Sequence, residues 1–395
     1  MVRGQGKAAG PTGGSREAAG SAGGSREAAG SAGGSREAAG SAGGSREAVP
    51  APVRRGRGSR PTIGDVAALA QVSKATVSFV INDRPGVSPQ ARRRVLDAID
   101  QLGWQPNAGA RALSTKRSQT LGLVIRRPPE LLSTDPFFLQ FVAGIETGLA
   151  PLGYALVLQV VPDEETERQA YERLARDGRV DGVFLTDLRT DDPRPALVTE
   201  LGIGALIVGP PQAGSRVPAL GVDDGSGVRR AVGHLRSLGH RWIGHVCGAA
   251  GYVHTQARLD AWRSALADAG LPEIPPVAAD FTGAAGARAT HQLLDMDRPP
   301  TAIVYANDLM AIAGITAATN RGLRVPEDLS VVGFDDIPLA DCIAPPLTTV
   351  RQDVPAWGRA AAQALVPLTE GGKFQAPALP PVEFVVRAST APPRT

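Results

Sequence analysis

The spacing of hydrophobic positions changes twice along the chain. Residues 1–60 contain almost no large apolar residue, whereas residues 61–105 carry apolar residues three and four positions apart. Residues 119–395 alternate short apolar runs with stretches of helical spacing. Spacings of three and four place side chains on one helix face, and strand–helix alternation predicts parallel sheets. The pattern predicts a helical head and an α/β body, with a short helix and linker between them at 106–118.

The first segment repeats the decapeptide Gly-Ser-Arg-Glu-Ala-Ala-Gly-Ser-Ala-Gly, starting at Gly14, Gly24 and Gly34. Ten residues are too few for a solenoid unit, and small side chains cannot offset the entropy of ordering a backbone. We therefore expect residues 1–60 to be a disordered low-complexity tail. It ends in a basic arm, residues 54–60, which either follows DNA phosphates or is a solvated linker.

Residues 61–105 predict a helix-turn-helix. The first helix is capped by Thr62, with Asp65 at the reciprocal position of a capping box. The second is capped by Ser73, and its inner apolar stripe begins at Val77. Two short helices joined by a turn of three to four residues are typical of a DNA-binding motif. A third helix is expected between the cap at Ser88 and Gly103.

The outward face of the second helix carries the residues expected to touch DNA. At about 100° per residue, Ala75 and Phe79 point away from the inner stripe. An outward phenylalanine fits a thymine methyl group in a major groove. The alternative is a small helical bundle with one stray surface aromatic ring. Other outward and first-turn side chains are Lys74, Thr76, Ser78 and Asn82.

In the body, apolar runs predict buried strands with helices between them. The expected strands are Leu121–Ile125, Ala155–Val161, Gly182–Leu185, Ala205–Val208, Trp242–Cys247, Ala302–Tyr305, Ser330–Phe334 and Val382–Val386. The expected helices are Phe138–Ala150, Thr166–Arg176, Gly227–Leu238, Arg258–Ala269, Ala284–Leu294 and Asp308–Arg321. Residues 119–395 contain more predicted strands and helices than one small sheet can hold. Two lobes are therefore predicted, with a ligand cleft at the carboxyl ends of the strands.

Charge is distributed unevenly along the 395 residues, although the net charge is only +3. Residues 1–60 carry ten Lys/Arg against four Asp/Glu, and residues 61–118 carry eight against four. The remainder is acidic. A basic N-terminal part followed by an acidic body indicates that the N-terminal part binds a polyanion.

Other features of the composition exclude several classes of protein. The two cysteines, Cys247 and Cys342, are too few for a disulfide scaffold or a four-cysteine zinc site, and no metal or cofactor is expected. No run approaches 18 apolar residues, so no membrane span is expected, and the N-terminus has no apolar signal core. The expected compartment is the cytoplasm. No converging nucleophile or acid–base set indicates an enzyme.

Residues 62–82, 87–106 and 106–113 together resemble the lactose-repressor family of bacterial transcription factors. The most specific part is Val72–Ser78 (VSKATVS), which is far more distinctive than a generic helix-turn-helix. The resemblance continues to about residue 390, for example in Asp135-Pro136-Phe137-Phe138. It implies an all-α head fused to a two-lobed body like the periplasmic sugar-binding proteins.

The resemblance also implies how DNA is bound. In that family the two heads of a dimer bind half-sites of a near-palindromic operator, and paired hinge helices enter the minor groove. Base choice is implied for Lys74, Ala75 and Phe79, and Leu113 would wedge into the central base step. The family commonly has Arg or His where this chain has Phe79. The complete expected DNA-binding set is Thr62, Ser73, Lys74, Ala75, Thr76, Ser78, Phe79, Asn82, Asn107, Arg111 and Leu113.

For the body, the resemblance implies that Arg258 and Asp308 grip an effector. A carboxylate accepts hydroxyl hydrogens and a guanidinium donates in a fork, which fits a sugar. A nucleobase-type corepressor is the alternative. Structural alternatives are a helix cap for Asp308, a surface ion pair for Arg258, and core packing for Phe137 or Phe138. The expected effector-binding set is Phe137, Phe138, Asp223, Arg258, Phe281 and Asp308.

The sequence therefore predicts a DNA-binding transcriptional regulator, most simply a repressor controlled by a small molecule. Expected partners are double-stranded operator DNA, a sugar-type effector and a second copy of the chain. A dimer is favoured over a tetramer because no leucine-heptad segment is visible near residue 395. A stand-alone sugar-binding protein is the alternative of a different class, and it would need an export signal and no basic head.

Overall fold

The computed structural model describes residues 61–105, 117–128, 132 and 135–394. The expectations for the tail at 1–60, and for Asn107, Arg111 and Leu113, lie outside the described residues. Among the described residues, no helix is long and apolar enough to cross a membrane.

The head is three short helices around a small apolar core, which confirms the predicted helix-turn-helix. They are α1 (Ile63–Ala70), α2 (Lys74–Ile81) and α3 (Pro89–Leu102). The backbone N–H and Oγ1 of Thr62 both donate to Asp65 Oδ2 at 2.8 Å, so the expected pairing at the start of α1 is present. Val66, Val77 and Val95, one from each helix, are fully buried against each other.

The first lobe of the body is a parallel sheet with strand order β2-β1-β3-β4-β5. Its strands are β1 (Thr120–Arg126), β2 (Ala155–Val161), β3 (Gly182–Leu185), β4 (Gly204–Val208) and β5 (Ala219–Leu220). Its helices are α6 (Pro136–Leu149), η1 (Ala150–Leu152), α7 (Glu164–Arg176), α8 (Arg194–Glu200) and α14 (Val354–Thr369). All these strands pair in parallel. Helices connect β1 to β2, β2 to β3 and β3 to β4, whereas a loop connects β4 to β5.

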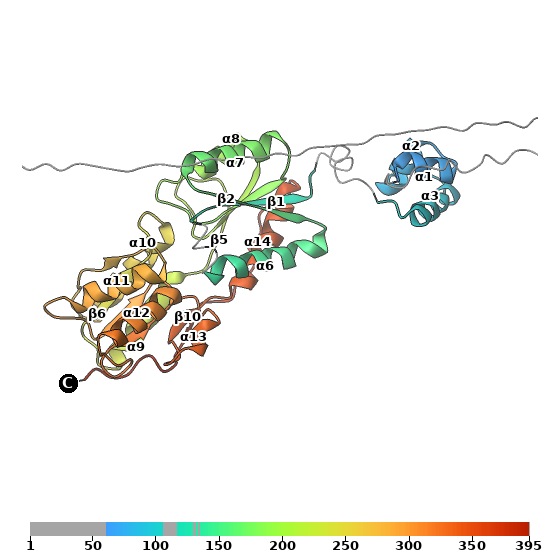
Figure 1. Cartoon of the computed structure of the whole chain (residues 1–395). Coiled ribbons are helices and arrows are strands. Elements are labelled where there is room, and N and C mark those ends of the chain that lie inside the picture. Colours follow the sequence, from blue (N-terminus) through green and yellow to red (C-terminus); the bar gives the residue numbers. More distant parts are fainter. Residues whose placement is uncertain (1–60, 106–116, 129–131, 133–134, 395) are drawn as a thin grey trace, which may run out of the picture. The chain divides into compact units, whose positions relative to one another are not determined.

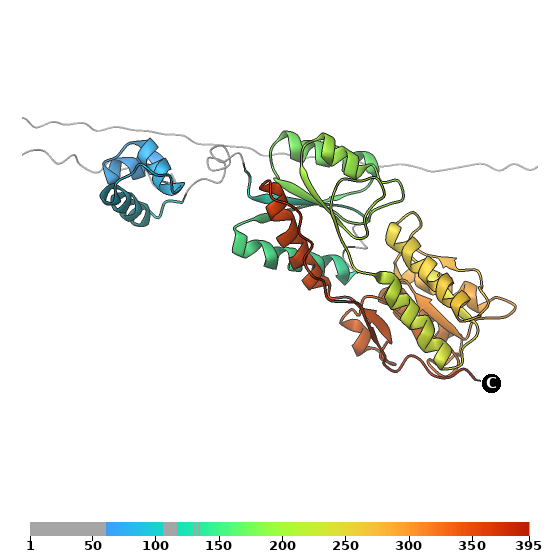
Figure 2. The same cartoon turned by 180° about the vertical axis from the view of Figure 1, so that it is seen from behind.

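Helix α14 belongs to this lobe although it lies near the end of the sequence. Figures 1 and 2 both show it beside α6, in red against green. The two helices approach closely because α6 has glycines where they meet: a side chain at Gly144 would overlap the Pro355 carbonyl, and one at Gly148 would crowd Ala362. The chain therefore passes into the second lobe and returns.

The second lobe is a parallel sheet with strand order β7-β6-β8-β9. Its strands are β6 (Ile243–Cys247), β7 (Val277–Ala278), β8 (Ala302–Tyr305) and β9 (Ser330–Val332). Its helices are α9 (Asp224–Ser237), α10 (Val253–Asp268), α11 (Gly283–Leu294), α12 (Asp308–Asn320) and α13 (Leu339–Cys342). A separate antiparallel pair joins β10 (Thr349–Arg351) to β11 (Glu383–Val385). Two parallel sheets in two lobes confirm the predicted fold class.

Two strand predictions need correction. The run at 382–386 does not join a parallel sheet, because it pairs antiparallel with β10. The run at 155–161 is β2, an edge strand rather than a buried one, and Leu158 and Val160 are exposed. The sequence prediction missed β5 and β7, which have two residues each.

Candidate DNA-reading helix and effector pocket

The start of α2 is held by its own hydroxyl groups. Ser73 Oγ accepts a hydrogen bond from the backbone N–H of Thr76 at 3.1 Å, which caps the helix. The hydroxyls of Ser73 and Thr76 also share a hydrogen bond of 2.9 Å. At the other end, Asn82 Nδ2 donates to the Ser78 carbonyl at 2.8 Å and to Ser78 Oγ at 3.3 Å. These four predicted DNA-facing groups are thus engaged within the helix.

The remaining predicted residues of α2 are exposed. Lys74 and Ala75 lie on the surface, and Phe79 has 39% of its area exposed. The Arg84 guanidinium lies 5.9 Å from the centre of the Phe79 ring. The structure therefore places Lys74, Ala75 and Phe79 together on the outside of the helix, as the periodicity predicts.

A pocket with an empty volume of about 770 Å³, part of it open to solvent, contains residues of both lobes. It lies beyond the carboxyl ends of the parallel strands, where such sheets hold ligands. Four of the six predicted effector-binding residues line it, namely Phe137, Phe138, Arg258 and Phe281. Further lining residues include Arg127, Asp135, Asp187, Asp224, His254, Asn307, Asp335 and Trp357.

Arg258 lies within α10 and is 6% exposed. Its guanidinium pairs with Asp224 Oδ2 at 2.8 Å and donates to the Ala306 carbonyl at 2.6 Å. The same group lies 3.7 Å from the centre of the Phe334 ring. Arg258 is therefore a buried, fixed cation of the pocket wall rather than half of a surface ion pair.

Asp223 and Asp308 do not line the pocket. Asp223 caps α9 and forms an exposed ion pair with Arg229. Asp308 is fully buried: Thr349 Oγ1 donates to one carboxylate oxygen at 2.5 Å, and the Ile337 N–H donates to the other at 2.8 Å. These contacts turn both carboxylates away from the cavity, which corrects the sequence prediction.

Asp335 and Asn307 lie in the pocket instead. Asp335 follows β9 in a left-handed backbone conformation (φ 108°) that aims its side chain inward, and Gln352 Nε2 donates to it at 3.2 Å. Burial raises the pKa of Asp335 well above its ordinary value, although Arg258 opposes this shift. Asn307 caps α12 and donates to the Phe281 carbonyl at 3.0 Å.

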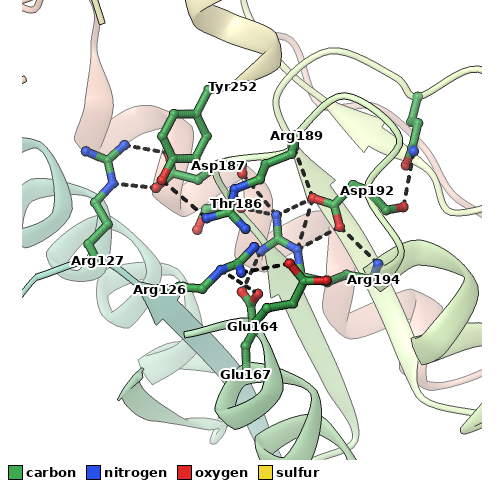
Figure 3. Close-up of polar contacts among 11 residues, drawn as sticks. Arg126, Arg127, Glu164, Glu167, Thr186, Asp187, Arg189, Asp192, Arg194 and Tyr252 are labelled. Carbon is green, nitrogen blue, oxygen red and sulfur yellow. Dashed lines mark hydrogen bonds and ion pairs between the residues drawn. The ribbon is translucent and has the colours of Figure 1, made fainter. Parts of the chain in front are cut away.

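Arg127 is the main pocket residue that the sequence analysis missed. Its Nε and Nη2 donate to the two oxygens of Asp187 at 2.6 and 2.9 Å, as Figure 3 shows. The guanidinium also lies 5.0 to 5.3 Å from three ring centres, those of Phe138, Tyr252 and Phe281. Because Phe138 belongs to the first lobe and the other two rings to the second, Arg127 bridges both walls of the pocket.

A buried ion network holds Asp187 in position for Arg127 (Figure 3). Arg194 pairs with Asp192 at 2.7 Å and with Glu167 at 3.1 Å. Its Nη2 also donates to the carbonyls of Thr186 and Asp187, at 2.9 and 3.0 Å. Burial disfavours the charge of Asp187, but the Arg127 guanidinium keeps the pKa of this carboxyl below its ordinary value. The loop that presents Asp187 is thus tied to α7 behind it.

The two lobes also meet through their backbones beside Tyr252. The Val253 N–H donates to the Leu188 carbonyl at 2.9 Å, and the Thr190 N–H donates to the Gly251 carbonyl at 3.0 Å. Together with Arg127, these bonds close one side of the pocket.

A helix-turn-helix head and a two-lobed body with a ligand pocket define the class of ligand-responsive DNA-binding regulators. Residues 62–107 match the family model described as bacterial regulatory proteins, lacI family, and residues 232–390 match that of a periplasmic binding protein-like domain. The chain is 37% identical over 321 residues to the HTH-type transcriptional regulator CelR of Thermobifida fusca, covering 78% of this chain and 92% of that protein. It is 33% identical to the regulator DegA of Bacillus subtilis (strain 168), covering 85% of this chain and 100% of that protein. The chain belongs to the lacI family.

Solved structures agree with this assignment. The lac repressor dimer bound to operator and the anti-inducer ONPF has a TM-score of 0.75 and 31% identity, covering 84% of this chain and 100% of that chain. The complex of transcriptional regulator CelR with cellobiose has a TM-score of 0.64 and 34% identity, with the same coverage. These similarities extend over both the head and the body.

Proposed function

We propose that this protein is a transcriptional repressor that binds a near-palindromic operator as a homodimer and responds to an uncharged sugar in the pocket. The observation that best supports this proposal is the excess of carboxylates over guanidiniums in the pocket lining. Its lining has four carboxylates, Asp135, Asp187, Asp224 and Asp335, but two guanidiniums, and each guanidinium is already paired with one carboxylate. The lining thus offers acceptors in excess.

Hydroxyl groups suit this arrangement because they donate to the excess acceptors. The backbone N–H of Phe137 donates to Asp135 at 3.0 Å, and Gln352 Nε2 donates to Asp335. A carboxylate can accept more than one hydrogen bond, so both groups keep lone pairs for a ligand. Burial lowers the pKa of His254 to about 4, so this ring is uncharged at neutral pH. A phosphate or carboxylate on the ligand would meet acidic groups, and the described lining residues offer it no cation without a partner.

The rings supply the apolar part of a sugar site. Phe137 lies at the pocket wall, packed edge-on against Phe138 and Trp357 at 5.4 and 6.2 Å between ring centres. Apolar faces with a few convergent polar groups are typical of small-molecule sites. The proposed effector set keeps Phe137, Phe138, Arg258 and Phe281. Asp224, Asn307 and Asp335 take the places expected for Asp223 and Asp308.

The relatives support the remaining parts of the proposal. Two of the solved neighbours are a lac repressor dimer bound to operator and a complex of CelR with cellobiose. For this chain we propose DNA contacts through Thr62, α2 and the hinge at 106–118, including Asn107, Arg111 and Leu113. We propose domain limits of 61–105 for the head and 119–395 for the body, and a cytoplasmic location.

The homodimer has a candidate surface on the first lobe. Leu139 of α6 is 65% exposed, and Leu158 and Val160 of β2 are also exposed. Leu158 and Val160 share one face of β2 with Leu156, which packs against the core that contains α6. Such large exposed apolar side chains on neighbouring elements are typical of a protein–protein interface.

The test combines calorimetry with a gel shift on DNA from upstream of the neighbouring genes. Neutral mono- and disaccharides should bind and change operator affinity, whereas their phosphorylated forms should not bind. Asp224→Ala should abolish sugar binding, and Asp223→Ala is the matched control because its carboxylate lies outside the pocket. Preferential binding of phosphorylated sugars, or loss of binding in the control alone, would contradict the proposed site.

A further inference from the structure

The outer surface of α2 combines a few small polar groups with an exposed apolar pair. Ser73 shares a hydrogen bond with Thr76, and Asn82 donates to Ser78, so each of these polar side chains already has one partner within the head. Of the proposed base-choosing residues, only Lys74 carries a polar group. Ala75 and Phe79, one turn apart, present a methyl group and a phenyl ring.

The exposed phenyl ring has a cation beside it. The backbone N–H of Arg84 donates to the Phe79 carbonyl at 2.9 Å, and the Arg84 guanidinium lies 5.9 Å from the centre of the ring. At an exposed site such a contact is a weak attraction. The head therefore exposes an apolar ring where a recognition helix faces base edges.

We infer that Phe79, with Ala75 beside it, reads the 5-methyl group of a pyrimidine in each operator half-site. This inference rests on the proposed function. In the major groove the thymine methyl is the apolar group, whereas the other base edges present donors and acceptors. A phenyl ring placed against those polar edges would take water from them without replacing the hydrogen bonds. The ring thus selects a methyl group and rejects unmethylated cytosine at the same position.

The chemical consequence concerns modified DNA. 5-Methylcytosine carries its methyl group at the same ring position as thymine, and deoxyuridine is thymidine without that methyl group. Operator affinity should therefore follow the methyl group rather than the base pair. Cytosine methylation at this position would raise operator affinity about fourfold.

The test begins with selection of operators from random duplexes by the full-length protein. Each thymine of the selected operator is then replaced singly by deoxyuridine, and binding is measured by gel shift at fixed salt. At one position in each half-site, we expect deoxyuridine to lower the operator affinity of the wild type about fourfold. This factor corresponds to the free energy of burying one methyl group. Phe79→Ala should bind the operator about tenfold more weakly and show no loss at that position. At the same position, 5-methylcytosine should bind better than cytosine.

Leu96→Ala is the matched control, because Leu96 of α3 is a similarly exposed apolar residue of the head (49%, against 39% for Phe79). It should keep the dependence on the methyl group. Circular dichroism of both variants checks that the head still folds, and Phe79→Leu, which keeps an apolar side chain, should retain part of the effect. The inference is overturned if deoxyuridine has no effect at any position, or the same effect in Phe79→Ala. If selection enriches no sequence at all, the proposed function fails instead.

Discussion

The recognition helix of the head and the pocket of the body differ in how deeply their candidate binding groups are buried. On α2 the hydroxyl and amide groups are paired with each other, and an exposed phenyl ring remains. In the pocket the guanidiniums of Arg127 and Arg258 are buried and each is paired with a carboxylate. The difference indicates that DNA is contacted by side chains exposed to solvent before binding. The effector, in contrast, is recognised by buried side chains that the fold already holds in place. Removing a group should therefore have different costs at the two sites.

The largest effect is expected for Asp224→Ala. It leaves the Arg258 guanidinium buried without its carboxylate, which should reduce the free energy of unfolding by about 3 kcal/mol. Chemical denaturation of the free protein measures this loss. The double variant Asp224→Ala/Arg258→Met should recover much of the stability but no effector binding. In Asp223→Ala, which loses an exposed ion pair and the cap of α9, the change should be about 1 kcal/mol. Equal effects of the two aspartates would remove the contrast between pocket and surface.

Arg127→Met should come next, because it leaves Asp187 without its cation while keeping an apolar side chain against the rings. We expect a loss of about 2 kcal/mol at neutral pH. The pKa of Asp187 is lowered in the fold, so its stabilisation is present above the ordinary pKa near 4 and is lost as the pH falls through the lower folded value. The stability difference between wild type and variant should therefore shrink in acid. A difference that is constant with pH would show that the ion pair is not its source.

Leu139→Asp addresses the surface proposed for the dimer. A charge at this exposed position should change the stability of one protomer by about 0.5 kcal/mol or less. If the surface is the interface, the same charge is buried unpaired in the dimer and should weaken association at least tenfold. Sedimentation velocity over a range of concentrations measures this change. A dimer of unchanged affinity would place the interface elsewhere.

The smallest effect on stability is expected for Phe79→Ala. Its ring is exposed, so the free energy of unfolding should change by about 0.5 kcal/mol or less, although operator affinity falls. Thermal unfolding without DNA measures the change. A large loss would mean that the ring supports the head core, and the proposed division between exposed reading groups and buried sensing groups would not hold.

Local patterns predicted the fold well where a short apolar run or a single apolar stripe marks a segment. The fully buried strands β3 and β8 have the predicted limits, and α2 begins and ends where its cap and stripe indicate. The sequence prediction missed helix α14, which is rich in alanine and largely buried. Strands β5 and β7 are too short for any period to be visible.

By itself, the sequence determined the helix-turn-helix, the two-lobed α/β body and the outward direction of Phe79, because helical period and caps act over a few residues. The choice between neighbouring carboxylates was decided only by the tertiary structure. Asp308 and Asp335 both follow strands of the second sheet, yet Thr349 and Ile337 turn the first inward to the core, and the left-handed backbone turns the second to the pocket. The same holds for Arg127, whose partners Asp187, Tyr252 and Phe281 come from distant parts of the chain. A side chain's direction depends on the groups that fill the space around it, and those groups are assembled only when the chain has folded.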